Sequence, residues 1–167
     1  MCIRDSSNDG GANWNIIDSG MSGSRYRPLI CVTPANPNVV YALFSASDYS
    51  FHGLYKSSDA GDTWAMQSDS PNILGRDTDG SSSGGQAWYD LSLGVATNNE
   101  DLVYVGGINL WRSDDGGVNW DIDASSGNGS NYSYMHVDQH AFEFSPHTNV
   151  AYAGNDGGFY KYVDALN

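Results

Sequence analysis

Short runs of apolar and aromatic residues recur along the chain and are separated by polar turns. Residues 39–44 (Val-Val-Tyr-Ala-Leu-Phe) are β-branched and aromatic, and residues 91–96 alternate with a period of two. Similar short runs occupy residues 102–106 and 150–153. No window has the spacing of apolar residues that an amphipathic helix requires. The pattern therefore predicts an all-β fold built from short strands.

Three of the polar turns share one motif. Residues 7–14, 57–64 and 113–120 align without gaps on the pattern S-x-D-x-G-x-x-W, which we call the Ser–Asp–Gly–Trp turn. Its key residues are Ser7, Asp9, Gly11 and Trp14, then Ser57, Asp59, Gly61 and Trp64, then Ser113, Asp115, Gly117 and Trp120. Residues 154–160 are interpreted as a degenerate fourth copy, with Asp156 and Gly158 at the key positions.

The composition of the motif indicates a structural role. An aspartate can accept hydrogen bonds from backbone N–H groups in the turn that follows it. A glycine permits a backbone conformation that a Cβ would penalise. The tryptophan that begins the next strand can bury its ring between sheets, which removes about 150–250 Å² from water. Each motif is therefore predicted to be a tight turn with an apolar anchor.

The spacing of the motif predicts the architecture. The key aspartates recur at intervals of 50, 56 and 41 residues, and periods in this range are typical of propeller blades or solenoid units. Four short strands per repeat, in up-and-down order, predict a β-propeller fragment of about three four-stranded antiparallel blades, incomplete at both ends. The expected parts are the end of a blade at 7–20, a blade at 24–69, a loop insertion at 70–86, a blade at 87–124 and a partial blade at 134–164.

Residues 1–6 are excluded from this partial propeller, which is expected to span residues 7–167. The hexapeptide Met-Cys-Ile-Arg-Asp-Ser matches the translation of a common sequencing adapter, so we expect it to be a scar. The cysteine that then remains is Cys31, within the apolar run 29–32. We interpret it as a small core residue, with a reactive thiol as the alternative.

The Ser–Asp–Gly–Trp turns resemble the Asp-box, or BNR, repeats of sialidase-like, xyloglucanase-like and sortilin-like β-propellers. Residues 85–91, 103–113 and 136–142 are similar to secreted bacterial BNR-repeat proteins. The resemblance implies a secreted, extracellular protein, often part of a larger multidomain chain. It is specific for the fold and says little about activity, because the same blades occur in hydrolases, receptors and assembly factors.

Charge limits the partners. The net charge of −13 disfavours nucleic acid and anionic membrane surfaces. No apolar run approaches the roughly 18 residues of a membrane-spanning helix. The partners expected are therefore a carbohydrate or protein ligand and additional propeller blades of the full-length chain.

Candidate ligand-binding residues precede the innermost strand of each predicted blade. In a propeller these positions tend to line the mouth of the central channel, so we expect them to converge on one face. They are Arg25 and Tyr26, then Gln86, Trp88, Tyr89 and Asp90, then His136, Asp138 and His140.

The last three residues have H-x-D-x-H spacing, which allows a metal site. On an extended strand they would share one face, and two imidazoles with a carboxylate are plausible ligands for zinc or iron. Steps of about 6.6 Å between them are wide for one ion. A hydrogen-bonded polar cluster is the alternative, as is direct ligand contact or acid–base work. We expect no cofactor, with a divalent metal as the lesser possibility.

Catalysis is the second functional hypothesis. The arginines and glutamates do not assemble the three-arginine, Tyr–Glu set of a sialidase. A xyloglucanase-like hydrolase needs two opposed carboxylates, for which Asp90 and Asp138 are weak candidates. The leading interpretation is a noncatalytic extracellular propeller module that binds glycans or proteins. The alternative is a glycoside hydrolase with part of its active site in the missing blades.

Overall fold

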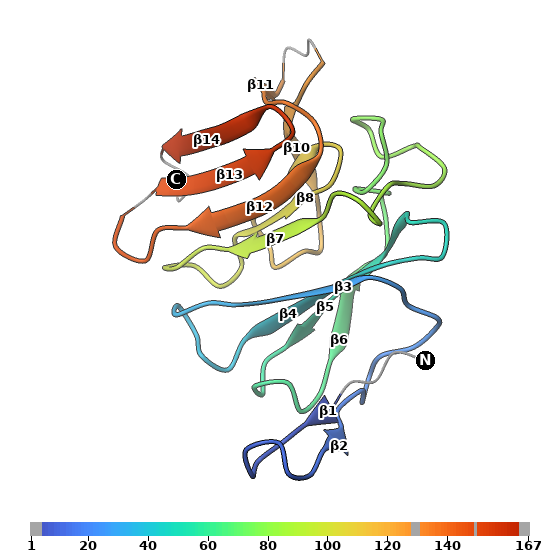
Figure 1. The fold of residues 1–167 in the computed structure, drawn as a ribbon, viewed down its shortest axis with the longest axis vertical. Helices are drawn as coiled ribbons and strands as arrows, with labels where there is room; N and C mark the ends of the chain where they lie inside the picture. The colour runs from blue at the N-terminus through green and yellow to red at the C-terminus, as the bar shows by residue number, and fades with distance from the viewer. Residues whose placement is uncertain (1–4, 128–130, 149, 164–167) are drawn as a thin grey trace.

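The computed structural model describes residues 5–127, 131–148 and 150–163 (Figure 1). A two-stranded sheet pairs β1 (Asp5–Ser6) with β2 (Asn15–Ile16). A four-stranded sheet contains β3 (Pro28–Val32), β4 (Val40–Ser45), β5 (Phe51–Ser57) and β6 (Ala65–Ser68). No helix occurs in the described residues, and therefore none that could span a membrane.

Two further sheets follow. One contains β7 (Ser92–Val95), β8 (Val103–Gly106), β9 (Leu110–Ser113), β10 (Asp121–Ser125) and β11 (Ser133–Tyr134). The last contains β12 (Gln139–Phe144), β13 (Val150–Asn155) and β14 (Gly158–Val163). Consecutive strands pair in antiparallel order, as predicted, except that the unexpected β11 runs parallel to β10. The predicted all-β propeller fragment is confirmed.

The first strands of the three larger sheets lie next to one another. β3 contacts β7, and β7 in turn contacts β12. Each of these strands begins toward the right of Figure 1, so the segments that lead into them lie on one side of the molecule, here called the loop face.

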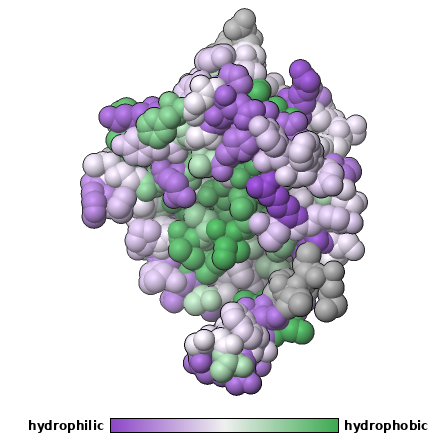
Figure 2. Space-filling view, in the orientation of Figure 1, coloured by the Kyte–Doolittle hydropathy of each residue, from purple (hydrophilic) through white to green (hydrophobic). Residues whose placement is uncertain are grey.

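Figure 2 shows an apolar patch near the centre of the same view, over β3, where Ile30 and Val32 are 75% and 64% exposed.

Two apolar clusters hold the sheets together. The first joins the β3–β6 sheet to the β7–β11 sheet and includes Tyr41, Leu54 and Trp111. Cys31 packs at its edge, where partial burial raises the pKa of the thiol. The second cluster joins the β7–β11 and β12–β14 sheets, and its centre is a stacked pair of buried rings, Tyr104 and Phe142, 4.7 Å apart.

The three Ser–Asp–Gly–Trp turns have the same hydrogen bonds. In the second turn, Gly61 N donates to Ser57 Oγ (2.8 Å) and Thr63 N donates to Asp59 Oδ1 (2.8 Å). The corresponding bonds occur at residues 7–13 and 113–119. Hydrogen bonds from the residue four positions later lower the pKa of each key aspartate, Asp9, Asp59 and Asp115, to about 2.

The tryptophans of these turns anchor each sheet to the one before it. Trp120 Nε1 donates to Ser68 Oγ (2.9 Å) and Trp64 Nε1 donates to Ile17 O (3.1 Å), and both rings are buried. Trp14 makes its indole bond within its own turn, to Gly11 O, and is 62% exposed. The motif therefore fastens successive blades together wherever a preceding sheet is present.

The expected fourth copy is a different kind of turn. Asn155 pairs with Gly158, so Asp156 occupies a two-residue hairpin turn between β13 and β14. These are the second and third strands of their sheet, whereas the turns at 57–64 and 113–120 join the third strand to the fourth and the turn at 7–14 joins β1 to β2. A two-residue turn is too short to surround an aspartate with backbone donors, and the Asp156 carboxylate instead accepts bonds from Tyr89 and His140.

Candidate functional site

The segments that lead into β7 and β12 are attached to the preceding sheet in the same way. Gly85 N donates to Asp48 O and Ala87 N donates to Tyr49 O, both in the β4–β5 turn. Asp138 N and Gln139 N donate to Ile108 O and Gly107 O in the β8–β9 turn. Backbone bonds therefore place the predicted site residues at fixed positions on the loop face.

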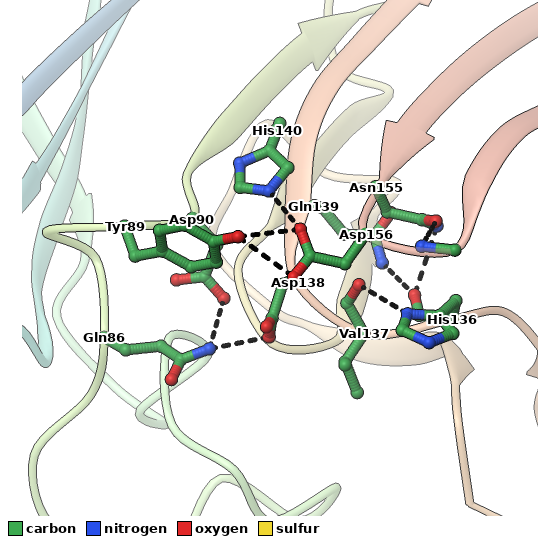
Figure 3. Close-up of polar contacts among 11 residues, drawn as sticks. Gln86, Tyr89, Asp90, His136, Val137, Asp138, Gln139, His140, Asn155 and Asp156 are labelled. Carbon is green, nitrogen blue, oxygen red and sulfur yellow. Dashed lines mark hydrogen bonds and ion pairs between the residues drawn. The ribbon is translucent and has the colours of Figure 1, made fainter.

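Gln86 joins two of the predicted carboxylates (Figure 3). Its Nε2 donates to Asp138 Oδ1 (2.6 Å) and to Asp90 Oδ2 (3.0 Å). Gln86 and Asp90 precede β7, whereas Asp138 precedes β12. The structure thus brings together residues 52 positions apart in the sequence, from adjacent blades.

Asp90 is the more perturbed of the two acids. Only 1% of it is exposed, and among the residues that the structure describes its Oδ1 has no hydrogen-bond partner. Burial, reinforced by the Asp138 charge, raises the pKa of Asp90 to about 6 against the opposing effect of the Gln86 bond. Asp90 therefore holds a proton more readily than an ordinary carboxylate, and the protonated form can donate to Asp138.

Tyr89, His140 and Asp156 form a second group beside the first, here called the Tyr89 cluster (Figure 3). The Tyr89 hydroxyl donates to both carboxylate oxygens of Asp156, at 2.9 and 3.0 Å, and His140 Nε2 lies 2.8 Å from Oδ1. The bonds from His140 and Tyr89 lower the pKa of Asp156, while the same carboxylate raises the pKa of Tyr89. Tyr89 is therefore held as a neutral hydrogen-bond donor.

A network of hydrogen bonds between buried side chains supports the loop face. Gln139 Nε2 donates to His136 O (2.5 Å), and Asn155 Nδ2 donates to the same carbonyl (3.1 Å) and to Gln139 Oε1 (3.2 Å). Because Gln139 and Asn155 are both buried and paired, the chain around His136 is held in place.

The metal site suggested by His136, Asp138 and His140 is not formed. His136 Nδ1 lies against Val137 O, Asp138 binds Gln86, and His140 turns to Asp156 (Figure 3). Asp138 has a φ of 65° and β12 begins only at Gln139, so the alternation of an extended strand does not apply to these three residues. The described residues contain no cluster of three or more potential metal ligands.

Arg25 and Tyr26 stay apart from the other candidates. The Arg25 guanidinium donates to Ser22 O (2.6 Å) and lies 5.5 Å from the centre of the Phe44 ring, so its side chain is buried within its own blade. Tyr26 is exposed, and no contact joins its side chain to the Gln86 or Tyr89 groups in the described residues. The expected convergence therefore holds for residues 86–90 and 138–140 and not for 25–26.

A cleft of about 480 Å³ opens beside Gln86 and Asp138, and we call it the Arg76 cleft. Most of its lining is polar and comes from four loops: Arg76, Asp77, Thr78, Gln86, Ile108, Asn109, Ser125, Ser126, Gly127, Tyr132, Val137 and Asp138. Arg76, Asp77, Gln86 and Ile108 also line a neighbouring hollow of about 410 Å³. A volume of this size suits a small polar ligand or part of a longer one.

The loop that carries Arg76 is ordered by one asparagine. Asn72 Nδ2 donates to Ser82 O (2.9 Å) and Gly84 O (2.8 Å), and its Oδ1 accepts from Phe51 N. Asn109 Nδ2 donates to Arg76 O (3.0 Å), which ties this loop to the β8–β9 turn. The wall of the cleft is thereby fixed by internal bonds.

Sequence analysis missed several residues of this face. Arg76 lies in a loop whose composition indicates only a solvated turn, and Asn109 begins a run that is interpreted as a structural strand. Asp156 was assigned to a structural turn, although it belongs to the Tyr89 cluster. One feature of the sequence could have indicated Arg76, which is a single arginine within the acidic, Gly- and Ser-rich segment 76–85, where a lone cation is unusual.

Comparison with known proteins gives the fold. No protein-family profile matches the chain, and no curated protein matches its sequence. The solved GH74 enzyme of Niastella koreensis is 21% identical with a TM-score of 0.52, over 81% of this chain and 21% of the enzyme. YCF48 from Cyanidioschyzon merolae is 18% identical with a TM-score of 0.48, over 81% of this chain and 33% of YCF48.

A GH74 xyloglucanase from Xanthomonas campestris is 18% identical with a TM-score of 0.40, over 94% of this chain and 26% of the enzyme. The chain thus spans a third or less of the length of each of these proteins. Likeness at this level of identity concerns architecture alone. The chain has the fold of part of a β-propeller.

Proposed function

We propose that this chain is part of an extracellular, noncatalytic β-propeller that binds a neutral glycan in the Arg76 cleft. The observation that carries the proposal is the cleft itself, which is lined by polar side chains from adjacent blades on the loop face. Arg76 supplies donors and Asp138 supplies acceptors, and Gln86, whose Nε2 already donates to Asp138 and Asp90, can offer its amide oxygen as an acceptor.

This lining matches the chemistry of sugar hydroxyls. Each hydroxyl donates one hydrogen bond and accepts others, so neighbouring hydroxyls fit a mixture of acids, amides and a guanidinium. The Arg76 charge is more than offset by Asp77 and Asp138 in the same cleft, which favours a neutral ligand over an anionic one. Tyr132 adds an aromatic ring to a mostly polar wall, a suitable surface for the C–H face of a pyranose.

The proposal includes further blades and secretion. Trp64 and Trp120 are buried against a preceding sheet, whereas Trp14 has the same position in an equivalent turn and is exposed. This difference supports a further blade that covers Trp14 in the full-length protein. The three Ser–Asp–Gly–Trp turns support membership of the Asp-box group, whose resemblance is also the basis for an extracellular location. Detection of the mature protein in culture medium would support secretion, and retention inside the cell would oppose it.

The second candidate function is glycoside hydrolysis. It is favoured by one observation: two acids near each other, one of which, Asp90, has a pKa of about 6. Asp138 lines the cleft, but Asp90 is 1% exposed and does not line it, so direct proton transfer from Asp90 to a sugar lacks a path. Binding is therefore the better-supported function.

The test is a panel of neutral and acidic polysaccharides and peptides, with binding followed by calorimetry and cleavage by release of reducing ends. We expect binding of a neutral glycan without turnover, weakened about tenfold or more by Asp138→Asn and by Asn109→Ala. Asn tolerates the positive φ at position 138, so that variant should remain folded. Asp114→Asn, at an exposed acid in the β9–β10 turn, is the control.

Two other outcomes would contradict the proposal. Turnover abolished by Asp138→Asn would establish the hydrolase instead. Binding confined to peptides would identify the propeller as a protein-recognition module.

A further inference from the structure

We propose that Trp88, with Tyr89 beside it, forms a second sugar-binding position, so that the ligand is a glycan chain and not a single sugar. This inference rests on the proposed function of the Arg76 cleft. Trp88 is 62% exposed, although Ala87 before it and Asp90 two residues after it are each only 1% exposed. A tryptophan that points outward between two buried residues contributes little to the core, and its exposure suits an external contact.

The Trp88 segment is rigid before any ligand arrives. Tyr89 N donates to Gln86 O (2.8 Å) and Ala87 N donates to Tyr49 O, which fixes the backbone on both sides of Trp88. The Tyr89 ring is held by its two bonds to Asp156 and by an edge-to-face contact with His140, 4.9 Å between ring centres. Because these groups are already ordered, binding would cost little conformational entropy.

Geometry connects this position to the cleft. Gln86 lines the Arg76 cleft and lies two residues before Trp88 on the same segment, and its partner Asp138 also lines the cleft and is two residues from His140 of the Tyr89 cluster. A ligand that extends out of the cleft along this segment therefore meets the Trp88 ring. The Trp88 and Tyr89 ring centres are 5.5 Å apart with a 45° tilt, which gives two apolar surfaces at an angle.

The chemistry of the position fits a carbohydrate better than a protein. A pyranose has an apolar C–H face and a rim of hydroxyls, which match an exposed indole with Asp156 and His140 close by. Protein interfaces need roughly 1,000 Å² or more of complementary surface. Two rings bordered by a carboxylate and an imidazole are a small patch for that purpose.

The test is the dependence of affinity on chain length. Calorimetry with cello-oligosaccharides and xyloglucan oligosaccharides, from the shortest to the longest available, would compare the unaltered protein with Trp88→Ala. We expect affinity to rise with length in the unaltered protein, and Trp88→Ala to weaken the longest ligands about tenfold while leaving the shortest unchanged. Trp14→Ala removes an equally exposed tryptophan, and should change neither.

The outcomes separate this inference from the proposed function. Oligosaccharides could bind with an affinity that depends neither on their length nor on Trp88→Ala, or Trp88→Ala could weaken the binding of every length equally. Either result would reject the sugar-binding position at Trp88 and leave the proposed function of the Arg76 cleft in place. If neither series binds the unaltered protein and the wider panel also fails, both proposals are rejected. Unchanged melting temperatures would show that each variant is folded, as expected for exposed side chains.

Discussion

Asp90 shows how one residue can be poorly placed for stability and well placed for a site. It is buried, its Oδ1 has no hydrogen-bond partner among the described residues, and Gln86 Nε2 donates both to its Oδ2 and to a second carboxylate, Asp138. A buried charge of this kind costs free energy at neutral pH. Such a cost, at a residue bonded to the cleft-lining Gln86, is typical of functional sites.

Asp90→Asn should stabilise the protein at neutral pH. The pKa of Asp90 rises from 3.8 to about 6 on folding, so its contribution to stability is greatest below pH 4 and is lost as the pH rises through 6. Asparagine imitates the protonated acid, so the variant should gain up to about 3 kcal/mol at pH 7 and nothing at pH 4. Chemical denaturation at both pH values measures this difference, with the exposed Asp77→Asn as control. Equal stability of Asp90→Asn and the unaltered protein at pH 7 would contradict the assignment.

The Ser–Asp–Gly–Trp turn is the element that repeats. Its aspartate satisfies backbone N–H groups that the tight turn would otherwise leave without partners, and its glycine adopts a positive φ, +99° at Gly61 and +88° at Gly117. These requirements act within eight residues, which is why the sequence alone predicts the turn. The tryptophan then links this local structure to the neighbouring sheet.

Asp115→Ala should destabilise the protein by about 1 kcal/mol, because Asn119 N and Val118 N lose their acceptor. The three turns should also make the fold sensitive to acid. The pKa of each key aspartate is about 2 when folded and 3.8 otherwise, so their contribution is present above pH 4 and is lost as the pH falls toward 2. Thermal melts between these limits measure both effects. The adjacent Asp114→Ala should have little effect, because its partner Arg112 forms an exposed ion pair.

Gly117→Ala should be far more damaging than Gly10→Ala. Both glycines have a positive φ, so both substitutions strain the backbone by about 1 kcal/mol. At position 117 the new Cβ would also collide with the Leu54 side chain of the neighbouring sheet, whereas at position 10 it would meet no atom within 4 Å. Comparison of unfolding midpoints tests this, and equal losses would mean that the turn does not pack between blades as described.

At the scale of the whole molecule, the sequence predicts the repeats well and the site only in part. Strands and turns depend on local patterns, so residues such as Asp59 and Trp120 were identified correctly as structural. The contact of Gln86 with Asp138 depends on how two blades meet, which no local pattern specifies. The metal site, the lesser possibility at the level of the sequence, is not formed in the described residues, because the positive φ at Asp138 interrupts the expected strand, and the side chains of Asp138 and His140 join polar contacts instead. Arg76 was missed because the path of its loop determines its position.

Trp120→Ala and Trp14→Ala should differ strongly in this chain. Trp120 is buried between sheets, donates to Ser68 and contacts Phe51 edge-to-face, so its loss should cost about 3–5 kcal/mol. Trp14 is exposed, and its loss should cost less than about 1 kcal/mol. Denaturant titration of both variants measures the ratio. A large loss for Trp14→Ala in a protein with further blades would indicate that another sheet covers it.

The shared bond from Gln86 to Asp138 has a mechanical consequence. Gln86 lies on a segment whose backbone is hydrogen-bonded to the β4–β5 turn, and Asp138 lies on a segment whose backbone is hydrogen-bonded to the β8–β9 turn. If one blade tilted relative to its neighbour, this hydrogen bond would stretch and the opening of the Arg76 cleft would change shape. Contacts between blades that lie away from the cleft, such as Thr33 with Ala96 and Tyr41 with Glu100, would therefore influence its shape.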